Sequence, residues 1–75
     1  MAKIDRKKAF QEMDYNCRTA VLCMISASVN AGAAKTVHPV RQAAHAKRII
    51  EFIESAIRDL EEARRHAETV CGSAS

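Results

Sequence analysis

Histidines and cysteines are the residues of this chain best suited to hold a metal or to act as nucleophiles. They are His38, His45, His66, Cys17, Cys23 and Cys71. Their spacing matches no zinc motif, and no two cysteines form a C-x-x-C pair. Cys71 stands near the expected C-terminus of a helix, where the helix dipole disfavours a reactive thiolate. We therefore expect no metal, no cofactor and no catalytic cysteine.

Paired carboxylates are the second candidate for chemistry. Glu51 and Glu54 form one pair, and Glu61 and Glu62 form another. General acid–base catalysis needs a pocket that perturbs the pKa values of such groups, and these pairs are interleaved with arginines on a charged stretch. A solvated helix face explains them, so the sequence predicts a protein that is not an enzyme.

Apolar residues repeat through the first half of the chain at alternating spacings of three and four. This spacing is typical of a heptad seam on an α-helix. It predicts a first helix over residues 4–31 and a connection over residues 32–38, in which Gly32 serves as a left-handed C-cap. The predicted seam consists of Phe10, Met13, Cys17, Ala20, Met24, Ala27 and Ala31.

A second apolar pattern predicts a helix over residues 39–70. Pro39 suits the first turn of this helix, and His38 before it suits an N-cap, with Thr36 as the competing cap. Gly72 marks the predicted end, so residues 71–75 are expected to fray. Charged residues occupy the outward positions of this helix.

These two patterns predict an all-α fold in one domain, residues 1–75, built as an antiparallel two-helix hairpin. If the turn centres near Lys35, the numbers of facing residues add up to about 70. Cys17 would then face Ile53 in the middle of the seam. Ile53 is accordingly expected to be a core residue.

The helices carry more apolar residues than one line of contact needs. A contiguous apolar patch is rare on a soluble monomer, so another protein surface is expected to pack against these residues. A second copy of the chain would give a four-helix bundle, and a groove on another protein is the alternative cover, with Phe52 as anchor. The expected interface residues outside the seam are Leu22, Ile25, Val29, Ile49, Phe52 and Ala56.

Charge is distributed unevenly along the chain, whose formal net charge is +3. Residues 1–50 carry nine Lys/Arg against three Asp/Glu, and residues 51–75 carry three Arg against six Asp/Glu. Basic residues gather where one end of the hairpin is expected, and they could contact phosphates. These candidates are Lys3, Arg6, Lys7, Lys8, Arg64 and Arg65. No aromatic residue interleaves them to stack on bases, which makes nucleic acid the second choice of partner.

The sequence also indicates in which cellular compartment the protein is expected. No apolar segment follows the basic start of the chain, so no secretory signal is expected. The longest uncharged stretch, residues 19–34, has 16 residues, fewer than the roughly 20 that a spanning helix needs. We expect a cytoplasmic protein with free thiols and no membrane contact.

The layout resembles Rop-type helical hairpins, which dimerise into four-helix bundles and bind RNA, and the likeness is one of architecture. Small helical hairpins also occur among accessory proteins of phages and mobile elements that inhibit host proteins. The predicted function is a non-enzymatic module that forms a homodimer and docks on and inhibits a partner protein. A nucleic-acid-binding regulator is the first alternative. A small chaperone or a subunit of a larger complex is the second.

Overall fold

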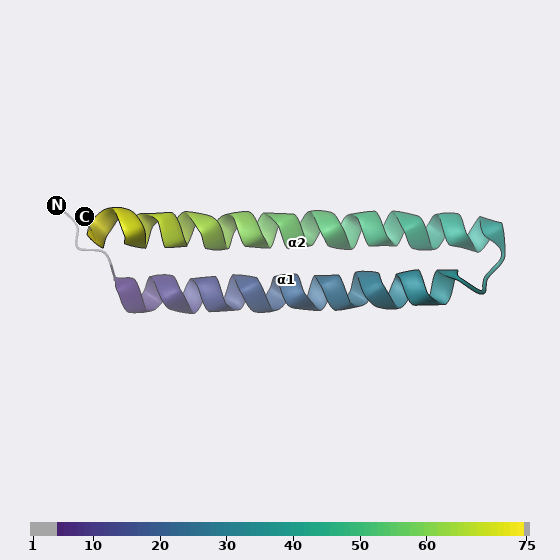
Figure 1. Ribbon diagram of the computed structural model, residues 1–75, viewed down its shortest axis with the longest axis horizontal. Helices are drawn as coiled ribbons and strands as arrows, with labels where there is room; N and C mark the ends of the chain where they lie inside the picture. Colours follow the sequence, from purple (N-terminus) through teal and green to yellow (C-terminus); the bar gives the residue numbers. More distant parts are fainter. Residues whose placement is uncertain (1–4, 75) are drawn as a thin grey trace.

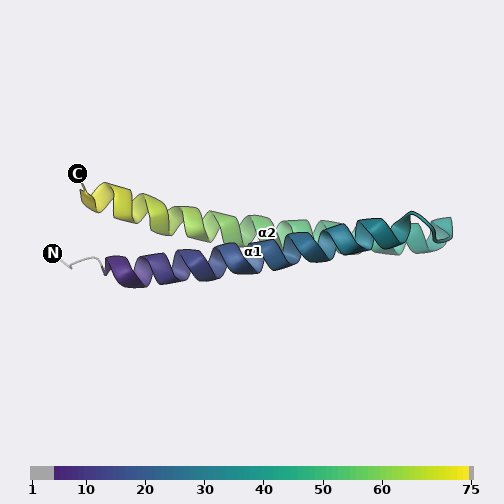
Figure 2. The same ribbon diagram turned by 60° about the horizontal axis from the view of Figure 1, so that its bottom comes forward.

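The computed structural model describes residues 5–74, with side chains to residue 72. These residues form α1 (Arg6–Ala34) and α2 (Pro39–Ala74), which run antiparallel and are joined by residues 35–38 (Figure 1). The molecule measures 58 × 15 × 14 Å, and its helices cross at a shallow angle (Figure 2). The predicted all-α antiparallel hairpin is confirmed.

Asp5 begins α1. Its backbone is extended, with φ −83° and ψ 94°, and its side chain accepts a hydrogen bond from the Lys8 N–H at 3.0 Å. An acidic N-cap satisfies one of the free N–H groups of the first turn and stabilises the positive end of the helix dipole. The predicted start at residue 4 lies outside the described residues.

The end of α1 differs from the prediction. Gly32 is helical and has no positive φ, so the predicted left-handed cap and the predicted helix end at residue 31 are wrong. Ala33 and Ala34 continue the helix because alanine is the best helix former. The Lys35 N–H donates to the Gly32 carbonyl, and the Gln42 side chain donates to the Ala34 carbonyl at 3.0 Å. Free carbonyl groups at the helix end are thereby satisfied.

The beginning of α2 follows the prediction, and its end does not. His38 is the N-cap, because its Nδ1 accepts a hydrogen bond from the Val40 N–H at 3.3 Å, and Pro39 is the first helical residue. The helix continues through Gly72 to Ala74, beyond the predicted end at residue 70. Gly72 does not end the helix because its φ is not positive.

Small residues form the seam between the helices. Ala20, Ala56 and Ala63 expose 1%, 5% and 7% of their surfaces, and Asn16 exposes 9%. Among the described residues, no large side chain is fully buried. Alanines at the contact allow two helix axes to approach closely, but they bury little apolar area.

Contacts between the helices fix their register. They join the side chains of Asn30 and His45 at 3.0 Å, the Ala34 carbonyl and the Gln42 side chain at 3.0 Å, and the side chains of Glu12 and His66 at 3.6 Å. The two residue numbers add up to 75–78 in these contacts, so the predicted value near 70 is wrong. The cause is the longer α1, which moves the turn to residues 35–38.

Gly32→Ala is expected to stabilise the hairpin by up to about 1 kcal/mol, because alanine is the better helix former by that amount. A Cβ at position 32 would meet no atom within 4 Å. Thermal unfolding followed by circular dichroism should show a higher Tm, since about 1 kcal/mol corresponds to roughly 4–8 °C in a domain of this size. A lower Tm would mean that Gly32 needs the left-handed conformation.

Candidate functional site

The largest apolar residues of the predicted seam are not buried between the helices. On α1 the seam follows Asn16, Ala20, Cys23 and Ala27, which are buried or half-buried, so the predicted positions Ala20 and Ala27 are confirmed. The physical reason is that alanines and small polar residues allow closer approach of the helices than isoleucines do. Phe10, Met24 and Ile53 are 47–59% exposed, so their predicted place in the core is wrong. Ile50, Ile57 and Leu60 on α2 are exposed as well.

Half of the predicted interface residues lie outside the seam. Leu22, Ile25 and Val29 are exposed, as expected. On α2 the prediction is wrong: Ala56 is buried, and Ile49 and Phe52 are half-buried. These three residues share one side of α2 at spacings of three and four, and that side faces α1.

Exposed apolar residues of the two helices gather on one face of the hairpin. Because each residue advances about 100° around a helix, residues one and four positions after a seam residue lie to the same side of it. In antiparallel helices this is the same side of the hairpin, so Val21 and Met24 share a face with Ile57 and Leu60. We call this surface the broad face; it comprises Phe10, Val21, Met24, Ile50, Ile53, Ile57 and Leu60.

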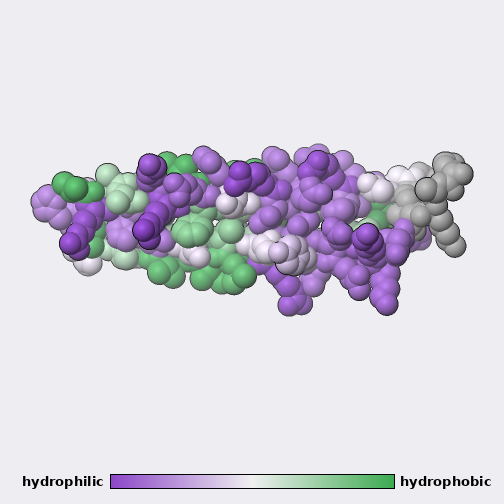
Figure 3. All heavy atoms as spheres, turned by 180° about the vertical axis from the view of Figure 1, so that it is seen from behind, coloured by the Kyte–Doolittle hydropathy of each residue, from purple (hydrophilic) through white to green (hydrophobic). Residues whose placement is uncertain are grey.

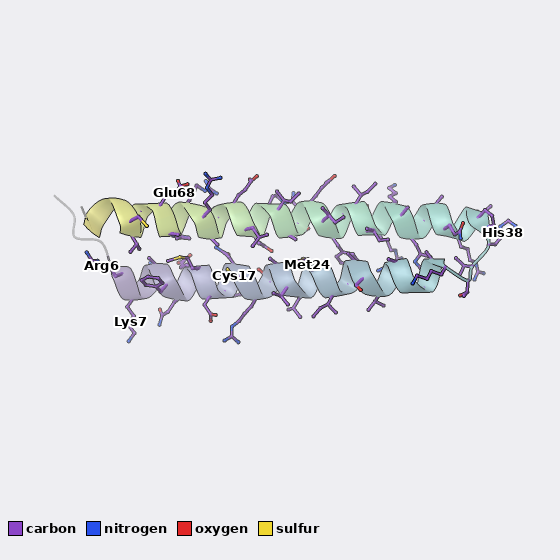
Figure 4. All side chains as sticks on the ribbon, in the orientation of Figure 1. Arg6, Lys7, Cys17, Met24, His38 and Glu68 are labelled. Atoms are coloured by element: carbon purple, nitrogen blue, oxygen red, sulfur yellow. The ribbon has the colours of Figure 1, made fainter. Side chains whose placement is uncertain are left out.

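Met24, labelled in Figure 4, marks the broad face on α1. The reverse side of the molecule is mostly hydrophilic toward the termini, with apolar atoms along its lower edge and toward the turn (Figure 3). The hairpin is therefore amphipathic as a whole, with the large apolar side chains to one side of the seam.

A second apolar surface follows the side of α1 that faces away from α2. We call it the outer stripe; it comprises Tyr15, Leu22, Ile25 and Val29, which are 54–67% exposed. Spacings of seven, three and four residues place these side chains along one edge of the helix. A shallow, open hollow beside Cys17, Arg18 and Leu22 separates the outer stripe from the broad face.

His45 and His66 link the two helices. His45 Nδ1 lies 3.0 Å from Asn30 Oδ1. His66 Nε2 lies 3.6 Å from a carboxylate oxygen of Glu12 and 3.4 Å from one of Glu62, which makes ion pairs when the imidazole is protonated. Within residues 5–74, no three His, Cys, Asp or Glu side chains come together in a geometry that could hold a metal ion.

The three thiols are free. Cys17 is exposed, so its predicted burial in the seam is wrong, whereas Cys23 is half-buried although it was expected beside the seam. Cys71 is exposed near the end of α2. The rotation of the seam that exposes Cys17 also turns Cys23 toward α2.

Basic residues gather at the end of the hairpin where α1 begins and α2 ends (Figures 1 and 4). Arg6, Lys7 and Lys8 are exposed there. The two arginines of α2 are paired within their own helix: Arg64 with Glu68 at 2.8 Å, and Arg65 with Glu62. Lys3, the remaining predicted phosphate contact, lies outside the described residues. Acidic partners thus reduce the positive field at this end.

By length and composition alone, α1 is apolar enough to cross a membrane, and only 11% of its most apolar 18-residue window is buried in the hairpin. The uncharged stretch at residues 19–34 covers only part of this helix. Core helices of soluble proteins and signal sequences have the same length and composition. The side of α1 that faces α2 carries Asn16 and Asn30, which favours a protein neighbour over lipid on that side.

The chain matches no protein-family model, no curated protein and no solved structure. Its function therefore has to be inferred from its own surfaces.

Ala20→Leu is expected to destabilise the hairpin by about 1–3 kcal/mol, because a side chain with no free space must push the helices apart. Ala20 is only 1% exposed. Ala33→Leu is the matched control: the same change at an exposed site should alter stability by no more than about 0.5 kcal/mol. Urea unfolding of both variants measures the difference. Equal stabilities would place the seam elsewhere.

Proposed function

We propose that this chain is a non-enzymatic protein-interaction module, which pairs with a second copy into a four-helix bundle and docks on and inhibits a partner protein. The observation that carries the proposal is the exposure of most of the large apolar side chains among the described residues, while the buried positions are alanines and an asparagine. Soluble monomers rarely expose apolar patches of that kind, and such patches mark association sites.

The shape of the chain supports association. Its radius of gyration is 17.1 Å, against the roughly 11 Å of a compact domain of this length. Its accessible surface is 5980 Å², about 1,400 Å² more than a compact monomer of 8.3 kDa exposes. Stable interfaces bury about 800 Å² per partner, so the excess alone is sufficient for one.

The two apolar surfaces suit different partners. The broad face spans both helices, and a four-helix bundle needs such a face on each pair of helices. We assign it to the second copy. The outer stripe is narrow and lies on α1 alone, in the way that a helix presents residues to a groove on another protein. We assign it to the partner protein.

Nucleic-acid binding is less well supported. A phosphate-binding surface gains affinity from unpaired cations, and Arg64 and Arg65 already have acidic partners.

Ile53→Asp is expected to abolish self-association and to leave the hairpin helical. Ile53 is 47% exposed in the single hairpin, but an aspartate in the core of a bundle would cost several kcal/mol. Sedimentation with circular dichroism measures both properties. Lys47→Asp places the same side chain on an exposed position outside the broad face and should remain dimeric. An Ile53→Asp protein that is still dimeric contradicts this assignment of the broad face.

Joint replacement of Leu22 and Val29 by aspartate should prevent capture of the partner without dissociating the dimer, because both side chains lie on the outer stripe and a charge there opposes docking in an apolar groove. Pull-down from a cell lysate followed by mass spectrometry, with and without nuclease, measures capture. Unchanged capture by the variant would exclude the outer stripe. Loss of every captured protein after nuclease treatment would favour the nucleic-acid alternative.

A further inference from the structure

Acidic residues are absent from the part of the hairpin next to the turn. All nine Asp/Glu stand within residues 5–14 and 51–68, whereas residues 15–50 contain five Lys/Arg and no Asp/Glu. The turn joins α1 to α2 at residues 35–38, so the end of α1 and the beginning of α2 lie side by side there (Figure 1). Neither helix carries an acid at that place, and the turn end of the hairpin is therefore positively charged.

Four cations at the turn end have no acidic partner. Their side chains belong to none of the ion pairs formed within residues 5–72. They are the exposed residues Lys35, Arg41, Lys47 and Arg48. By contrast, Arg64 and Arg65 near the termini pair with glutamates of their own helix. A cation without an intramolecular partner is available to an anion on another molecule.

Two of these arginines lie on the same side of the hairpin as part of the outer stripe. Residues one and four positions before a seam residue lie on the reverse side, opposite the broad face. Leu22 and Val29 each come one position before a half-buried residue of α1, and Arg48 comes one position before a half-buried residue of α2. Arg41 comes four positions before His45, which contacts α1. All four side chains therefore belong to the reverse side.

We call this surface the turn patch; it comprises Leu22, Val29, Arg41 and Arg48. Contacts between the helices join residues whose numbers add up to 75–78, so Val29 is level with Arg48, and Arg41 is level with the end of α1. Leu22 and Val29 are 63% and 66% exposed. On this side, apolar atoms follow the lower edge toward the turn and hydrophilic atoms lie above them (Figure 3). The turn patch is thus an apolar strip with guanidinium groups beside it.

The combination of arginine with aliphatic side chains distinguishes among anionic partners. A nucleic-acid backbone would engage Arg41 and Arg48 alone and would leave Leu22 and Val29 against charged phosphates. Helices that lie on anionic lipid commonly anchor with Trp or Phe, and residues 16–51 contain no Phe, Tyr or Trp. Protein carboxylates form bidentate pairs with arginine, and arginine is enriched in protein interfaces. A protein surface with acidic groups beside an apolar centre therefore engages the whole turn patch.

We infer that the turn patch binds a protein surface on which carboxylates flank an apolar centre. The apolar centre packs on Leu22 and Val29, and the carboxylates pair with Arg41 and Arg48. This inference rests on the proposed function and deepens it by giving the chemistry of the partner's docking site. The turn patch lies opposite the broad face, so a second copy on that face leaves it accessible. The acids of the other half of the hairpin repel the same carboxylates, which directs the partner toward the turn.

Charge reversal tests the inference on the partner protein that the pull-down captures and mass spectrometry identifies. Arg41→Glu with Arg48→Glu should weaken binding of the purified partner at least about tenfold, because each change removes an ion pair that contributes up to about fivefold and introduces repulsion. Lys7→Glu with Lys8→Glu is the matched control: it reverses two exposed charges at the other end of the hairpin. Screening should keep its effect on the affinity below about threefold. Calorimetric titration measures the affinities, and circular dichroism checks that each variant is helical. If the charge reversal lowers helicity, Arg41→Gln with Arg48→Gln gives the same comparison with a smaller loss.

The outcomes separate the inference from the proposed function. A loss of affinity that is confined to the variants at positions 41 and 48 supports the inference. Equal effects of the two charge reversals, or an affinity of the unmodified chain that does not change between about 50 mM and about 300 mM NaCl, overturn it and leave the proposed function intact. If no protein is captured, both are overturned. Tighter binding to vesicles of phosphatidylcholine and phosphatidylglycerol in about a 2:1 ratio, or to a DNA duplex, than to the captured protein would overturn the inference and identify a different occupant.

Discussion

The close approach of α1 and α2 through small residues is the constraint on which the rest of this structure depends. Ala20, Ala56 and Ala63 bring the helix axes together, and each buries only a methyl group. Ile49 and Phe52 are half-buried beside this seam, but most of the large side chains lie to one side of it and stay exposed. A tight seam and an exposed apolar face are therefore two consequences of one packing choice, because the residues that allow close approach cannot also form a large core.

Polar groups give the seam its register. Alanines along a helix are nearly interchangeable, so an alanine seam tolerates sliding, whereas Asn30 meets His45 in a single register. Asn16 contributes differently: its Nδ2 is buried and has no hydrogen-bond partner among the described residues. An unsatisfied amide costs about 1–3 kcal/mol, and a seam of small residues offsets such a cost poorly. The hairpin alone is therefore stabilised only weakly, and burial of the broad face against a second copy would add to its stability.

Sequence periodicity predicted the two helices, their antiparallel order and the cap at His38, because these features depend on local spacing and on Pro39. It did not predict which stripe forms the seam. Apolar residues cover a wider arc of each helix than one contact uses, and ranking them by hydrophobicity selects Ile53 over Ala56. Packing geometry reverses that ranking. The predicted positions of the helix ends were wrong for a related reason. Gly32 and Gly72 would end a helix in the left-handed conformation, which a glycine residue permits but does not require.

The positions of the apolar surfaces around α1 connect the proposed dimer to the proposed function. Val21 and Met24 lie roughly at right angles to the outer edge of the helix, where Leu22 and Val29 are exposed. A second copy on the broad face would leave that edge accessible, and the two-fold symmetry would present it twice. Two equivalent docking edges on one rigid bundle can bind an oligomeric target with an avidity greater than either affinity. Dimerisation would thus stabilise the fold and strengthen docking at the same time, which explains how a chain with so small a core can serve as an interaction module.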